Sequence, residues 1–148
     1  MIRLADEAAT LAIGAALAAC VRPGDVIALS GDLGMGKTTL ARGLLSALGL
    51  AEEAPSPSFA IVQPYDVPEV RIPVAHVDLY RLDDPEDAQE LGLDDMRYDS
   101  VLLIEWPERL GDALWPDALR LSLQPTADGA RALTATVPPS WEGRWPPK

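Results

Sequence analysis

The chain has 148 residues, enough for one domain and too few for two ordinary ones. Its 12 Lys and Arg residues stand against 23 Asp and Glu residues, and the resulting net charge of −11 argues against unaided binding of DNA or RNA. One Cys and one His exclude an internal disulfide framework and a zinc site built from those two residue types.

The N-terminal third predicts two helices on either side of a buried strand. Good helix formers occupy residues 5–20, acids lie in the first turn, and Pro23 and Gly24 follow, so we expect a helix there. The apolar run 26–29 predicts a buried strand. After a glycine-rich turn, a second helix is expected over residues 37–48.

The apolar part of the first helix has an alternative interpretation. Leu17-Ala18-Ala19-Cys20 is similar to a bacterial lipoprotein cleavage box. However, Asp6 and Glu7 stand where a signal peptide needs positive charge, and the apolar stretch is about half the roughly 20 residues of a membrane span. We therefore expect an Ala-rich amphipathic helix in a cytoplasmic protein without membrane attachment.

The rest of the chain predicts strands joined by turns and one acidic stretch. Runs with strand character occur at residues 59–62, 72–79, 101–104, 118–123 and 133–137. The last two flank the polar turn 126–129 and predict a hairpin. Residues 64–69 look like a turn. The acidic stretch 83–99 is expected to start a short helix at Pro85 and to be a solvated face or a docking surface for a basic partner.

These elements together predict an α/β fold with a mostly parallel central sheet, antiparallel edge strands and helices on its faces. We expect one domain over residues 1–137. The Pro- and Trp-rich tail, residues 138–148, is either disordered or a strap laid over the domain. In such sheets, ligands bind at the carboxyl ends of the strands.

A complete phosphate-binding motif stands between the first strand and the second helix. Gly31-Asp32-Leu33-Gly34-Met35-Gly36-Lys37-Thr38 matches G-x-x-x-x-G-K-[ST]. The glycines let consecutive backbone N–H groups converge on phosphate oxygens, and the following helix adds its positive end. Lys37 can reach the β- and γ-phosphates, and the Thr38 hydroxyl can bind Mg²⁺. A chance glycine turn is the alternative, but the strand and helix around the motif favour nucleotide binding.

The lysine content favours ATP over GTP. A guanine-reading Asn-Lys-x-Asp motif needs an interior lysine, and besides Lys37 the chain has only the terminal Lys148. The loop by itself does not distinguish an ATPase from a kinase.

Two apolar runs end in a carboxylate, one at Asp78 and one at Glu105. Either acid alone is most simply a solvated strand-end residue. Two of them downstream of an intact phosphate loop favour metal chemistry, with Glu105 as the Mg²⁺ partner and Asp78 assisting the metal or orienting water. His76 shares the face of Asp78 if this segment is a strand, and we expect a hydrogen-bonded core residue. Trp106 could lie near the nucleotide or simply end the strand.

Four segments taken together resemble the TsaE (YjeE) family, small bacterial ATPases of tRNA threonylcarbamoyladenosine biosynthesis. The segments are residues 31–39, Ser56-Pro57-Ser58-Phe59, His76-Val77-Asp78-Leu79-Tyr80-Arg81-Leu82 and Glu105-Trp106-Pro107-Glu108-Arg109. They follow the family order between about residues 4 and 137. The last two segments are the most specific.

The resemblance implies a P-loop NTPase-like three-layer sandwich that uses ATP and Mg²⁺. It implies ATP hydrolysis, slow alone, in support of the proteins of a threonylcarbamoyl-transfer complex. Those partners would modify the adenosine next to the anticodon and would hold the tRNA, which agrees with the acidic composition.

The resemblance also assigns roles to residues. Lys37 grips phosphate, Thr38 and Glu105 serve Mg²⁺, and Asp78 is a second essential acid. The implied nucleotide-binding set is Glu7, Gly31, Asp32, Leu33, Gly34, Met35, Gly36, Lys37, Thr38, Thr39, Ser58 and Trp106. Ser58, where the family usually has Thr, belongs to a segment expected to switch with nucleotide state.

Two other functions remain open from the sequence. A small-molecule kinase generally needs lid arginines, but Arg81, Arg97 and Arg109 are scattered among acids. A nucleotide-dependent binding module with negligible hydrolysis would need only the phosphate loop.

Overall fold

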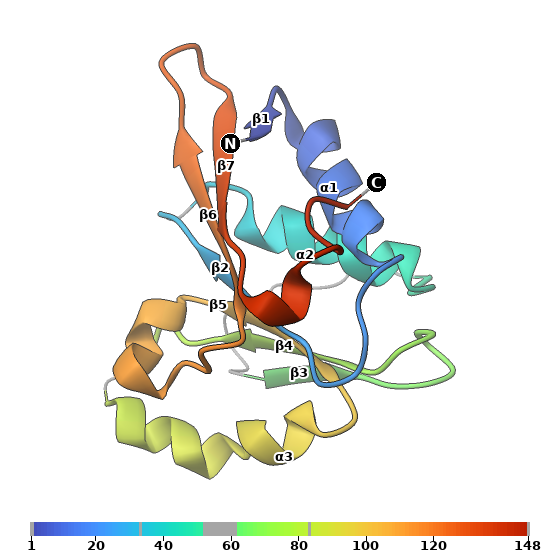
Figure 1. The fold of residues 1–148 in the computed structure, drawn as a ribbon, viewed down its shortest axis with the longest axis vertical. Coiled ribbons are helices and arrows are strands. Elements are labelled where there is room, and N and C mark those ends of the chain that lie inside the picture. Colours follow the sequence, from blue (N-terminus) through green and yellow to red (C-terminus); the bar gives the residue numbers. More distant parts are fainter. Residues whose placement is uncertain (1, 33, 52–61, 83, 148) are drawn as a thin grey trace.

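The computed structural model describes residues 2–32, 34–51, 62–82 and 84–147. These residues form one seven-stranded sheet with helices on its faces (Figure 1). In chain order the elements are β1 Ile2–Leu4, α1 Glu7–Leu17, β2 Val26–Ser30, α2 Lys37–Ala47, β3 Val62–Tyr65, β4 Val74–Asp78, η1 Pro85–Leu91, α3 Leu93–Arg97, β5 Val101–Glu105, η2 Pro107–Ala113, β6 Leu119–Pro125, β7 Arg131–Thr136 and η3 Pro139–Trp141. None of the helices in these ranges has the length and apolar character of a membrane span.

The strand order is β1-β7-β6-β2-β5-β4-β3. The four central strands pair in parallel, through β6–β2, β2–β5 and β5–β4. The outer pairings β1–β7, β7–β6 and β4–β3 are antiparallel. The α/β class and the antiparallel edges are therefore as expected. A parallel majority is not confirmed, since three of the six pairings are parallel and three antiparallel; a tight turn rather than a crossover helix returns β7 beside β6.

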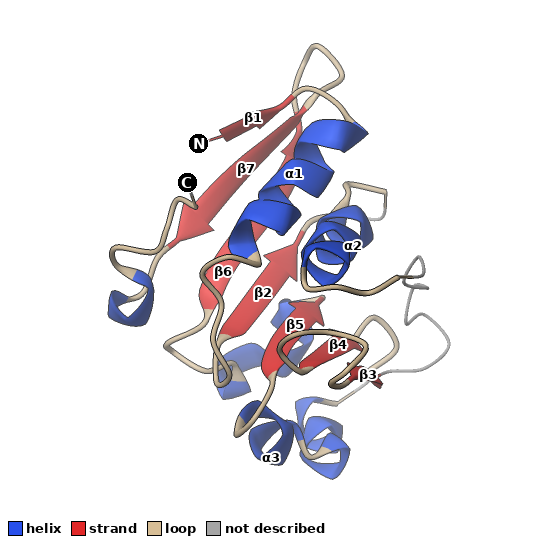
Figure 2. Ribbon diagram, turned by 90° about the vertical axis from the view of Figure 1, so that its right-hand side faces the viewer, coloured by secondary structure: helices blue, strands red, loops and turns tan. Residues whose placement is uncertain are grey.

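Alternating side chains of the central strands feed two apolar clusters, one on each face of the sheet. Ile27 and Leu29 of β2 join the cluster beneath α1 and α2, whereas Val26 joins the cluster beneath η1, α3 and η2. Figure 2 shows α1 and α2 side by side against one face. Because β2 is covered on both faces, it is a near-continuous apolar run, which is why the sequence revealed it.

Most sequence-predicted elements are present with shifted ends, one expectation is wrong, and some short elements were not predicted. The short strand β1 was not expected, because three residues are too few for a period of two to show. Pro64 lies in β3, not in a turn, and pairs with Ala75. Because β3 is an edge strand, the missing N–H of proline leaves no partner unsatisfied. The segment after β5 is helical. Of the predicted strand 59–62, only Val62 is among the described residues.

The C-terminal tail is a strap. Trp141 is fully buried in the cluster beneath α1 and α2. The Arg144 guanidinium lies 4.0 Å from the centre of the Trp141 ring and donates to both carboxylate oxygens of Asp25, at 2.7 and 3.0 Å. Burial of a large aromatic side chain together with a paired arginine holds this segment against the domain.

Candidate functional site

The phosphate loop joins β2 to α2 at the carboxyl end of β2. Gly31 and Gly36 have positive φ angles of 144° and 101°. A Cβ atom added at Gly31 would lie 2.6 Å from the carbonyl oxygen of Leu123, so a side chain would displace the loop. Gly36 precedes α2, and no side chain caps this helix N-terminus. The first N–H groups of α2 therefore remain available for an anion, as a bound phosphate requires.

Lys37 begins α2 and is only 5% exposed. Its ammonium group donates to the carbonyl oxygen of Gly31 and lies 3.5 Å from the centre of the Trp106 ring. Burial lowers the pKa of Lys37, and nearby carboxylates, foremost Glu105, partly offset this effect. A desolvated ammonium beside a helix N-terminus without a side-chain cap is well suited to an anionic ligand.

Glu105 ends β5 and is buried, with 3% of its surface exposed. The Thr38 hydroxyl donates to its two carboxylate oxygens, at 3.1 Å to Oε1 and 3.3 Å to Oε2. His76 Nε2 lies 2.6 Å from Oε2, and it is the donor because an ionised carboxylate can only accept. The structure thus brings the two sequence-predicted magnesium residues, Thr38 and Glu105, into direct contact.

His76 is fully buried and hydrogen-bonded, which confirms the sequence-based expectation for it. The sequence did not indicate that its partner is Glu105, because that contact depends on the parallel register of β4 and β5. Asp78 lies directly opposite Glu105 in this register. Its Oδ1 accepts from the backbone N–H of Tyr80 at 2.9 Å. Both predicted acids therefore stand at the same end of neighbouring strands.

Trp106 follows directly after β5 and lies beside Lys37, so the two sequence interpretations are compatible. Among the described residues it is the one non-glycine residue with positive φ, 61°. Its ring packs against Tyr80, with 5.0 Å between ring centres. A bulky residue in this backbone conformation is strained, and such strain is typical of functional sites.

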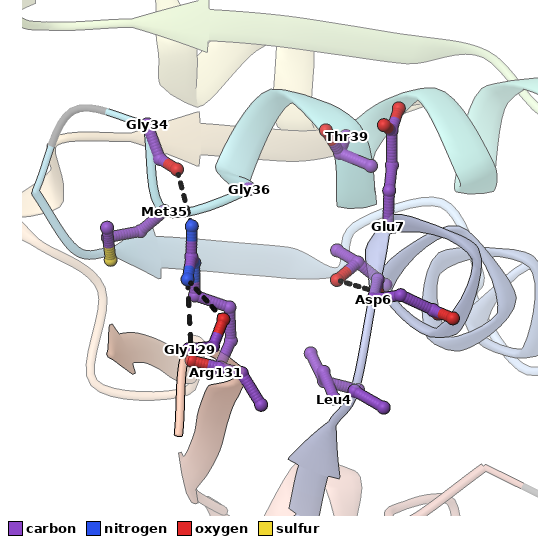
Figure 3. Close-up of a pocket in the computed structure, with 12 residues that line it drawn as sticks. Leu4, Asp6, Glu7, Gly34, Met35, Gly36, Thr39, Gly129 and Arg131 are labelled. Atoms are coloured by element: carbon purple, nitrogen blue, oxygen red, sulfur yellow. Dashed lines mark hydrogen bonds between the residues drawn. The ribbon is translucent and has the colours of Figure 1, made fainter. Parts of the chain in front are cut away.

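A pocket of about 340 Å³ lies between the start of α1, the phosphate loop and the turn before β7 (Figure 3). The predicted residues that line it are Glu7, Gly34, Met35, Gly36 and Thr39. Figure 3 shows that Glu7 and Thr39 lie near each other on one side of it. Its position beside the loop suits the base and ribose of a nucleotide.

Sequence reasoning missed the other residues of this pocket, among them Thr10 and Arg131. Thr10 is buried within α1, and the Arg131 guanidinium donates to the carbonyl oxygen of Gly34 at 3.4 Å (Figure 3). Neither residue stands in a recognisable motif. Only the antiparallel hairpin and the position of β1 bring the start of β7 to the loop.

The remaining predicted residues fall elsewhere. Asp32 is exposed and lines a second hollow of about 400 Å³ with Gly31 and Trp106. Leu33 and Ser58, together with the rest of the segment expected to switch, lie outside the described residues.

A metal ion at this site would need ligands beyond the protein. In the described part of the chain, no three His, Cys, Asp or Glu side chains come together as a metal-binding cluster. Mg²⁺ usually keeps several waters and takes phosphate oxygens together with one or two protein ligands. The oxygen donors Thr38 and Glu105, beside a loop suited to phosphate, fit that mode of binding.

Comparison with known proteins gives concordant results. Residues 4–133 match the model of the family described as "Threonylcarbamoyl adenosine biosynthesis protein TsaE". The tRNA threonylcarbamoyladenosine biosynthesis protein TsaE of Bacillus subtilis is 35% identical over 136 residues, which span 91% of this chain and 84% of that protein. The Streptomyces coelicolor protein of the same name is 42% identical over 129 residues, 84% of this chain and 87% of its own. The crystal structure of Bacillus subtilis YdiB superposes with a TM-score of 0.80 at 30% identity, covering 96% of this chain and 88% of that one.

Proposed function

The chain belongs to the TsaE family, as its sequence resemblance indicated, and we propose that it is the ATPase component of the bacterial machinery for tRNA threonylcarbamoyladenosine. ATP hydrolysis would support the partner proteins that transfer threonylcarbamoyl to the adenosine next to the anticodon. The acidic chain would act in the cytoplasm and leave tRNA binding to those partners.

The observation that carries this proposal is the contact of Thr38 with Glu105 beside a buried Lys37. The backbone N–H groups of the loop and the Lys37 ammonium would bind the β- and γ-phosphates. Thr38 and Glu105 would hold Mg²⁺, which neutralises charge on the phosphate oxygens. Asp78, opposite Glu105, would orient the attacking water or assist the metal ion.

The wider fold supports the same reading. Helices cover both faces of the sheet, as in the three-layer sandwich of P-loop NTPases, and the loop lies at the carboxyl end of a central strand. The pocket lined by Glu7, Thr39 and Arg131 would hold the nucleoside part of ATP.

The test is ATP turnover by the purified chain, alone and with its partner proteins and tRNA. We expect slow hydrolysis alone, faster hydrolysis in the complete system, and loss of both in Glu105→Gln. Glu142→Gln is the matched control, since Glu142 is exposed on the C-terminal strap. Unchanged turnover in Glu105→Gln would refute its role.

Two outcomes would favour the other functions. ATP-dependent phosphorylation of a small metabolite without partners would indicate a kinase. Tight ATP binding with equally negligible hydrolysis in both conditions would indicate a nucleotide-dependent binding module.

A further inference from the structure

His76 lies where it can control the geometry of the site without reaching it. We propose that His76 is a positioning residue that fixes the Glu105 carboxylate for the divalent cation, an inference that rests on the proposed function. Its ring comes from the middle of β4, one strand away from Glu105, and both side chains are almost completely shielded from solvent.

The Glu105 carboxylate is held from two sides. The contact with His76 is 2.6 Å, shorter than either contact with the Thr38 hydroxyl, 3.1 and 3.3 Å. A short hydrogen bond to an ionised acceptor is among the stronger contacts that a protein makes. Because it engages Oε2, it restricts the rotation of the carboxylate, whose two oxygens both lie within reach of the Thr38 hydroxyl.

This histidine is also a poor core residue. Its Nδ1 atom is buried and has no hydrogen-bond partner among the described residues. An unsatisfied buried polar atom costs free energy, and an aliphatic side chain at this position of an otherwise apolar strand would avoid that cost. The hydrogen bond to Glu105 is what an aliphatic side chain could not provide.

Asp78 provides a contrast within the same site. It is partly exposed at the strand end, and its hydrogen bond to the Tyr80 N–H is a local one within two residues. Among the described residues, no other strand contributes a hydrogen-bond partner to it, whereas Glu105 is held by side chains from β4 and α2. His76 therefore makes Glu105 the rigid acid of the pair. Residues that orient a metal ligand typically change metal affinity about 10- to 100-fold when they are replaced.

The experiment measures the gain in ATP affinity that Mg²⁺ provides. ATP is titrated calorimetrically into the full chain, with Mg²⁺ and separately with EDTA, for the parent, His76→Leu and His76→Gln. In His76→Leu we expect the gain from Mg²⁺ to fall about 10- to 100-fold, with the affinity in EDTA unchanged. In His76→Gln we expect most of the gain to return, since its amide N–H extends as far as imidazole Nε2. A merely structural role would not separate these two affinities.

Each outcome decides the question. A full Mg²⁺ gain in His76→Leu, or an equal loss in the Leu and Gln variants, would overturn the inference. If His76→Leu does not fold, His76→Asn replaces it, because its amide is too short to reach Oε2. A parent that binds no ATP under either condition would overturn the proposed function itself, an outcome distinct from the others.

Discussion

Two regions on the same face of the sheet differ in what they bury: closely packed backbone in one, and polar or charged side chains in the other. Where α1 crosses α2, the backbones touch, because a Cβ atom added at Gly14 would lie 2.1 Å from the Leu40 carbonyl oxygen and one at Gly43 would lie 2.3 Å from that of Leu11. At the carboxyl ends of β2, β4 and β5, the molecule instead buries charged and polar side chains. All the buried polar or charged residues of the described chain lie at or beside this site: Thr10 lines the pocket next to the loop, Lys37 and Glu105 lie at the loop itself, and His76 contacts Glu105.

The difference indicates that the contact between α1 and α2 serves stability, whereas the polar site at the strand ends serves function. Close apolar packing stabilises the helix pair. Buried charges contribute little to stability, so their concentration at one edge indicates function. The comparison therefore predicts that changes at the site impair catalysis and spare folding, whereas changes between the helices do the reverse.

Lys37→Ala should have the largest effect. Loss of a charge-stabilising donor typically costs about 100- to 1,000-fold in turnover. The unfolding temperature should change little, because removing the ammonium also removes its desolvation cost. Steady-state hydrolysis and thermal unfolding, measured on the same preparation, check the expected loss of turnover and the expected unchanged unfolding temperature. A large loss of stability with turnover retained would contradict this expectation.

Gly14→Ala tests the helix contact. In an open helix this change stabilises by about 1 kcal/mol. Here the added methyl group would overlap Leu40, so we expect a loss of about 1–3 kcal/mol in the free energy of unfolding, measured with urea. Ala15→Ser, at an exposed neighbouring position, should change it by less than about 0.5 kcal/mol. A stabilised Gly14→Ala variant would show that the helices are not in close contact.

Arg131→Ala tests whether the pocket beside the loop is part of the ATP-binding site. If the pocket holds the nucleoside part of ATP, loss of this guanidinium should weaken ATP binding by roughly threefold to tenfold, the scale of one partly exposed hydrogen bond. The control Arg120→Ala removes an equal charge from an exposed position on β6. Equal ATP affinities in the two variants, measured by calorimetry, would place the nucleoside elsewhere.

Replacing Asp128 should have the smallest effect on stability, and this exposed carboxylate can be compared with the buried charged groups of the site. Hydrogen bonds from Thr126 and Arg3 lower the pKa of Asp128 from 3.8 to about 2. A pKa lowered by folding means that the carboxylate stabilises above pH 3.8 and that this contribution fades as the pH falls towards 2. Asp128→Asn should therefore lower the unfolding temperature slightly at pH 7 and less at pH 2. A deficit independent of pH would contradict this.

Local patterns in the sequence were sufficient for the features that depend on consecutive residues. The phosphate loop, the buried strand before it and the acids that end β4 and β5 were all predicted, because each belongs to one short segment. The His76–Glu105 contact, the lining of the pocket by Arg131 and the burial of Trp141 were not, because each joins segments far apart in the chain. The prediction of a turn at Pro64 was wrong for a related reason, since only the order of the strands shows that Pro64 belongs to an edge strand, where proline is tolerated.

The proposed function depends on the binding of a triphosphate by the loop from Gly31 to Thr38, with Mg²⁺ beside Glu105. Calorimetric titration of ATP into the parent chain and into Lys37→Ala, with and without Mg²⁺, measures this binding. We expect one binding site in the parent, tighter with Mg²⁺ and lost or strongly weakened in Lys37→Ala. No heat of binding in the parent, or identical isotherms for the two proteins, would contradict it.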